Sequence, residues 1–153
     1  MAYTDPYQYL KQPVEFKVKY RIPEYAFTTD KEIIFVPVVA ANLFGSRHSH
    51  ITFDPNLESR QYPFTDGCSK LIELSETITL PANMTLVSAP ESKQITGTGA
   101  DFESSYTLEG NILKFNQRVV LKKRVYQPED WPSFKDAVTF GNEFATKQVI
   151  LNY

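Results

Sequence analysis

Apolar and polar residues alternate along several short segments of the chain, a pattern typical of β-strands that have one buried face. The alternation is regular over residues 14–20 and again over 71–80, where it predicts a long strand. Residues 33–39 are almost continuously apolar, which predicts a strand buried on both faces. Pro37 within that run indicates a bulge or a sheet edge, because proline cannot donate a ladder hydrogen bond.

The clearest hairpin lies in the second half of the chain. Residues 102–108 alternate, turn residues occupy 109–111, and the strand pattern returns over 113–125. Shorter segments complete a set of about eight predicted strands. These segments are 61–64, 84–88 and 93–96.

Helical spacing replaces strand alternation near the end of the chain. Ser133, with Asp136 three positions later, predicts an N-cap for a helix over 133–147. Gly141 costs about 1 kcal/mol relative to alanine inside a helix, so we expect a break there. Residues 149–151 are then expected to finish the chain as an edge strand.

The length of 153 residues suits one domain with a sizeable core. The 11 Phe and 9 Tyr, with many Val, Ile and Thr, favour strands over helices. We therefore expect a mostly β fold, an antiparallel jelly-roll-like β-sandwich with a short C-terminal helix. It is expected to span residues 13–153, and 1–12 to serve as a linker or lead-in.

Charge and hydropathy exclude several classes of partner. A net charge of −2 argues against nucleic-acid binding, which needs a concentrated basic face. The basic cluster at 122–124 lies in a predicted strand, so a solvated strand face is a stronger interpretation than a polyanion contact. No run of about 18 apolar residues predicts a membrane span, and the first residues lack the pattern of a secretory signal.

Cys68 is the single cysteine and the one candidate nucleophile of the thiol class. It would need an imidazole to activate it, and His48 and His50 are the two histidines of the chain. Both precede Cys68, which reverses the cysteine-then-histidine order of papain-like and transglutaminase chains. Cys68 also lies in a predicted turn, away from a helix start that would lower its pKa. We expect an inert thiol and no catalytic residue.

A metal site and a phosphate loop are similarly weak interpretations. His48 and His50 share a face if their loop is extended, and Asp54 could add a third ligand. No fourth ligand is evident, so surface histidines are the stronger interpretation and we expect no metal or cofactor. The segment 97–99 lacks the lysine of a phosphate-binding loop, which favours an ordinary turn.

Two aromatic residues are candidates for ligand binding. Tyr62 lies beside Pro63, and Trp131 lies in the turn-like segment 128–132, so either ring could be exposed and stack on a sugar. For Trp131 the alternative is that it packs the helix start onto the core. We favour that alternative because Trp131 precedes the predicted cap by two positions.

Several strand and turn patterns resemble the C-terminal β-sandwich domain, of unknown function, of bacterial transglutaminase-like proteins. The patterns are Ser59-Arg60-Gln61-Tyr62-Pro63-Phe64, Ile78-Thr79-Leu80-Pro81 leading to Pro90-Glu91, Ser105-Tyr106-Thr107-Leu108, residues 118–124, residues 126–131, and a short helix with Phe134 and Phe140. The resemblance covers 59–153. It implies a jelly-roll-like sandwich, an attached transglutaminase core domain or another protein as partner, and export to the periplasm or cell surface within a larger protein. The family's catalytic residues belong to the core domain, and none maps onto this chain.

The sequence thus predicts a non-catalytic accessory domain of a transglutaminase-like protein that scaffolds or contacts protein or substrate. A carbohydrate-binding module is the alternative, because jelly rolls often bind glycans.

Overall fold

The computed structural model describes residues 2–3, 16–17, 19, 21–41 and 56–153. Over these residues the chain is mostly β, with several antiparallel sheets, none closed into a barrel, and one short C-terminal helix. The predicted mostly β, antiparallel fold with a short C-terminal helix is therefore confirmed, and the jelly-roll-like sandwich stays a prediction. One hydrophobic cluster joins the sheets and the helix.

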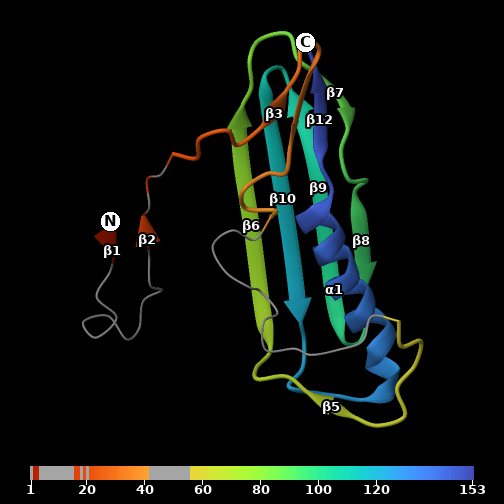
Figure 1. The fold of residues 1–153 in the computed structure, drawn as a ribbon. Helices are drawn as coiled ribbons and strands as arrows, with labels where there is room; N and C mark the ends of the chain where they lie inside the picture. Colours follow the sequence, from red (N-terminus) through yellow and green to blue (C-terminus); the bar gives the residue numbers. More distant parts are fainter. Residues whose placement is uncertain (1, 4–15, 18, 20, 42–55) are drawn as a thin grey trace.

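The larger sheet contains the strands that the sequence predicts most clearly. Its order is β6 (Lys70–Thr79), β10 (Ile112–Leu121), β9 (Ala100–Glu109) and β8 (Lys93–Thr96), all antiparallel (Figure 1). The predicted hairpin joins β9 to β10 through Gly110, whose φ of 61° favours glycine. Alternate residues of β9 and β10 are buried, so one face of this sheet lies on the core.

The predicted strand over 113–125 is wrong in its length. β10 ends at Leu121, and a separate short strand, β11 (Val125–Tyr126), pairs with β5 (Phe64–Thr65). The Lys122 backbone N–H still donates to the Gly99 carbonyl, the next pair in register after Leu121 and Ala100, and the chain leaves the larger sheet beyond it.

The smaller sheet has the order β3 (Phe27–Thr28), β4 (Glu32–Phe35), β12 (Val149–Asn152) and β7 (Thr85–Ser88). The final strand, expected at an edge, is interior, because β12 pairs with both β4 and β7.

The strand predicted over 33–39 stops at Phe35. Pro37 follows two residues later and has no N–H for a ladder. The backbone N–H groups of Val38 and Val39 donate instead to the Glu76 carboxylate of β6, at 3.3 and 2.9 Å.

The N-terminal region is described only in part. β1 (Ala2–Tyr3) pairs with β2 (Phe16–Lys17). Most of the predicted lead-in at 1–12 and of the strand at 14–20 lies outside the described residues. The proposed domain boundaries stay predictions.

The C-terminal helix begins earlier than the sequence predicts. A 3-10 turn, η1 (Pro128–Asp130), leads into α1 (Trp131–Thr146), which continues through the buried Gly141 without a break. Ser133 is therefore not the cap. Its Oγ accepts hydrogen bonds from the backbone N–H groups of Gly99 and Ala100, at 3.0 and 3.3 Å, and so fastens the helix to the start of β9.

One face of α1 packs on β9 and β8, as expected. Phe134, Val138 and Phe144 are buried, and the Phe144 ring lies 5.9 Å from Phe102 and 5.8 Å from Tyr106 between centroids. In Figure 1 the helix lies over the β8 side of the larger sheet, while β6 forms its opposite side.

Candidate interaction site

The predicted nucleophile and the predicted metal ligands do not form a site in the described part of the chain. Cys68 is exposed in the turn before β6. His48, His50 and Asp54 lie outside the described residues. Within the described ranges, no group of three or more His, Cys, Asp or Glu residues could hold a metal ion.

Trp131 and Tyr62, the two predicted ligand-binding residues, occupy opposite environments. The Trp131 side chain is 0% exposed, and its indole N–H donates to the Leu57 carbonyl at 2.9 Å. The Arg60 guanidinium lies 4.4 Å from the centroids of both Trp131 and Phe64. Trp131 therefore belongs to the core, as the alternative interpretation has it, and presents no open face to a sugar.

Tyr62 is 77% exposed, but Trp131 is buried and cannot serve as a second exposed ring beside it. The structure does not bring the two rings into one exposed platform. Arg60, which the sequence reasoning did not single out, fixes the buried ring by a cation–π contact.

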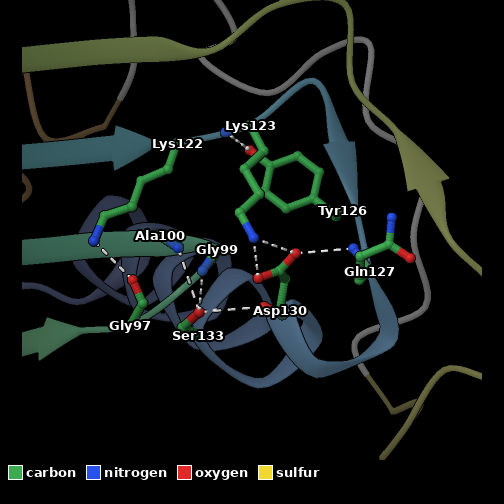
Figure 2. Close-up of polar contacts among 9 residues, drawn as sticks. All are labelled: Gly97, Gly99, Ala100, Lys122, Lys123, Tyr126, Gln127, Asp130 and Ser133. Atoms are coloured by element: carbon green, nitrogen blue, oxygen red, sulfur yellow. Dashed lines mark hydrogen bonds and ion pairs between the residues drawn. The ribbon is translucent and has the colours of Figure 1, made fainter.

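Two of the three basic residues at 122–124 have acidic partners: Lys122 pairs with Asp101 of β9, and Lys123 pairs with Asp130 at the start of the helix. Figure 2 shows the second pair. Lys122 Nζ lies 2.7 Å from Asp101 Oδ1, and Lys123 Nζ lies 2.7 and 2.9 Å from the two carboxylate oxygens of Asp130. Residues 122–124 were predicted to lie on a solvated strand face. They instead connect β10 to β11, and ion pairs hold Lys122 and Lys123 in place.

Asp130 is fully buried at the centre of this group. Burial alone would raise its pKa, but hydrogen bonds from Lys123 and from the backbone N–H of Gln127, at 2.8 Å, outweigh that effect and lower the pKa. The carboxylate is thus held ionised as part of the fold.

The Gly97-Thr98-Gly99 segment forms the β8–β9 turn and lies very close to the start of the helix. A Cβ at Gly97 would lie 2.2 Å from Ser133 Cβ, and one at Gly99 would lie 2.6 Å from the Asp130 carbonyl. Only glycine allows this contact at both positions, which supports the turn interpretation over a phosphate loop.

An apolar strip runs across the outer face of the smaller sheet. Phe27 pairs with Ile34, and Ile34 pairs with Ile150, so the three side chains lie side by side on one face of β3, β4 and β12. Phe27 is 67% exposed, and Ile34 and Ile150 are half-buried outside the core cluster. We call these three residues the apolar strip.

A hollow of about 680 Å³ lies at the β3 end of the apolar strip. Its wall includes Tyr25, Phe27, Ile34 and Val36, with Glu24 and Gln148 as polar members. An exposed apolar surface with a polar rim is typical of a protein-contact site.

The outer face of the larger sheet is polar by contrast. A hollow of about 330 Å³ lies on it, lined mainly by Glu73, Ser75, Glu103, Asn116 and Arg118. Arg118 Nε lies 3.5 Å from Glu73 Oε1, and both side chains are about half exposed or more, at 49% and 66%. An exposed pair of this kind contributes little to stability.

The chain also matches the model of a known protein family. Residues 31–151 match the model of a domain of unknown function with a solved structure, DUF3858. The chain belongs to this family. No curated protein matches the chain.

A solved structure shares the fold of this DUF3858 domain. It is a crystal structure described as a "putative protease" from Parabacteroides distasonis, with a TM-score of 0.60 and 16% sequence identity. The alignment covers 81% of this chain but 24% of the other, so this chain spans about a quarter of that protein. At this identity the likeness shows the fold alone.

Sequence reasoning missed the apolar strip, although a signal for it exists. Residues 33–35 and 149–151 are each continuously apolar, the pattern of strands covered on both faces. The core covers Phe35, Val149 and Leu151 on the inner face. On the outer face of the same strands, Ile34 and Ile150 are half-buried and lie outside the core cluster of the described residues. No helix in those residues is long and apolar enough to cross a membrane.

Proposed function

We propose that this chain is a non-catalytic accessory domain that docks, through the apolar strip, on a transglutaminase-like core domain of the same longer protein. The observation that carries this proposal is that residues 33–35 of β4 and 149–151 of β12 are apolar on both faces. Among the described residues, the core cluster includes the inner-face side chains Phe35, Val149 and Leu151, while Ile34 and Ile150 on the outer face lie outside it. A neighbouring protein domain would complete the burial.

Two further observations support a place within a longer protein. The chain resembles the C-terminal domain of transglutaminase-like proteins, and the same fold forms 24% of a longer solved chain. The resemblance also suggests export to the periplasm or cell surface. Carbohydrate binding has less support, because Trp131 is buried and Tyr62 is left without a second exposed ring from the predicted pair.

The docking proposal predicts that one substitution weakens binding but leaves stability nearly unchanged. Phe27→Asp should change the free energy of unfolding by less than about 0.5 kcal/mol, since the side chain is 67% exposed. It should weaken binding to a separately produced transglutaminase-like core by at least about tenfold, because burying a Phe contributes about 1.5–3 kcal/mol. Isothermal titration calorimetry measures the binding affinity, and denaturant melts measure the free energy of unfolding.

Tyr62→Asp is the matched control, because Tyr62 is 77% exposed and far from the strip in sequence. It should leave binding unchanged. Equal loss of binding in both variants, or unchanged binding in Phe27→Asp, would refute docking through this face.

The non-catalytic part of the proposal is tested separately. The isolated chain should neither incorporate a fluorescent amine into a glutamine peptide nor hydrolyse a protein substrate above the buffer rate. Cys68→Ala should leave both rates and the melting curve unchanged, because Cys68 is an exposed turn residue. Activity that scales with chain concentration and disappears in Cys68→Ala would show that the chain is an enzyme.

A further inference from the structure

We propose that the outer edge of β6 binds an extended segment of a partner polypeptide that alternates apolar and basic residues. The bound segment would add a fifth strand to the larger sheet, beside β6. This surface lies on a different sheet from the apolar strip, so the inference goes beyond the proposed docking and does not depend on it.

The first argument is the geometry of β6 (Lys70–Thr79) as a terminal strand. It pairs with β10 over its ten residues in unbroken antiparallel register, without a bulge. In the part of the chain that the structure describes, no strand pairs with its other side. A long and regular edge of this kind offers a row of backbone donors and acceptors to an added strand.

The opposite edge of the same sheet differs. β8 (Lys93–Thr96) has four residues, so it offers little backbone to a partner. Short or covered edges are a common protection against unwanted pairing. The contrast makes β6 the edge that is suited to binding.

The second argument is the chemistry of the two faces of β6. On the core side, Ile72, Leu74 and Ile78 are only partly buried and pack against the core cluster. On the outer side, Leu71 is 57% exposed and the Glu73 side chain is 66% exposed. An added strand would therefore meet Ile72, Leu74 and Ile78 on the core side, where the Glu76 carboxylate is already bonded to the backbone of residues 38–39. On the outer side it would meet Leu71 and the exposed carboxylate of Glu73.

This combination specifies the occupant. Side chains directly opposite on neighbouring strands lie about 4.5–5.5 Å apart, so apolar residues of the partner would extend the apolar row of β6. A lysine or arginine on the partner's other face would reach Glu73, whose present partner Arg118 is exposed and weakly held.

The test uses a short acetylated peptide of alternating Val and Lys as the probe, with a Val and Glu peptide as the control probe. The Val and Lys peptide should bind the intact chain in a titration followed by NMR. Amide hydrogen exchange along β6 should slow on binding, while exchange along β8 stays the same. The Val and Glu peptide should bind about fivefold more weakly, because repulsion from Glu73 replaces attraction to it.

Two variants with the same charge change locate the site. Glu73→Lys, at the edge, should weaken binding of the Val and Lys peptide by at least about fivefold. Glu103→Lys, on β9 of the same face, should change it by less than about twofold. Melting curves of both variants are the check that each remains folded.

Several outcomes would overturn the inference. One is the absence of peptide binding, and another is binding that slows exchange in strands other than β6. Equal effects of Glu73→Lys and Glu103→Lys would indicate a diffuse charge effect. Dimerisation of the free chain with protection of β6 would show that a second copy occupies the edge.

Discussion

Replacing Phe144 with alanine is expected to lower the free energy of unfolding by about 3–5 kcal/mol, the cost of removing a buried Phe and leaving a cavity. The Phe144 side chain is 0% exposed. Its ring meets Phe102, Tyr106 and Phe115, with centroids at 5.9, 5.8 and 6.3 Å, so it joins α1 to the centre of the larger sheet. Urea or guanidinium melts measure the loss.

Phe140→Ala is the matched control on the same helix. Phe140 is half-buried, and its ring lies 6.0 Å from Phe102. We expect a loss of about 1–2 kcal/mol, in proportion to the smaller apolar area that it buries. A Phe144→Ala loss below about 1 kcal/mol, or equal to the Phe140→Ala loss, would show that α1 is peripheral to the core.

Lys123→Met is expected to cost about 3 kcal/mol at neutral pH, because it leaves the buried Asp130 carboxylate without its cation. Breaking a buried pair by removing one partner costs about 3–5 kcal/mol, and the 40% exposure of Lys123 favours the low end. Lys122→Met is the control. Its pair with Asp101 is partly exposed on both sides, at 33% and 26%, and should contribute about 1 kcal/mol or less.

The pH dependence of this effect has a definite sign. The pKa of Asp130 is lowered in the folded chain from its ordinary value of 3.8, so the ionised carboxylate stabilises the fold above that value. The contribution disappears as the pH falls through the lowered pKa of the folded state. The stability difference between the wild type and Lys123→Met should therefore be full at neutral pH and narrow in acid. A difference that stays constant down to acid unfolding would contradict the ion-pair account.

Local patterns predicted the strands well where the determinants are local. The alternation of β6 and the turn at Gly110 between β9 and β10 are visible in consecutive residues, and the structure confirms both. The helix start was predicted less well, because Ser133 fits the local cap rule but bonds to Gly99 and Ala100, more than thirty residues earlier. Such a partner cannot be read from spacing along the chain.

In the candidate site, too, local features were predicted and features that depend on distant residues were not. The burial of Trp131 depends on Leu57 and Arg60, which lie some seventy residues away, so the sequence could only offer alternatives. The interior position of β12 depends on strand order, which consecutive residues do not encode. Its continuous apolar run at 149–151 was nevertheless a signal against an edge strand.

The docking proposal is tested most directly by placing a photo-crosslinking phenylalanine analogue at position 27 in the cells that produce the protein. Phe27 is 67% exposed on the apolar strip, so the analogue should be tolerated and should contact whatever covers the strip. The account predicts crosslinked peptides that map to a transglutaminase-like core, and none when the analogue replaces Tyr62. Crosslinks from position 27 only to unrelated proteins, or to nothing, would contradict it.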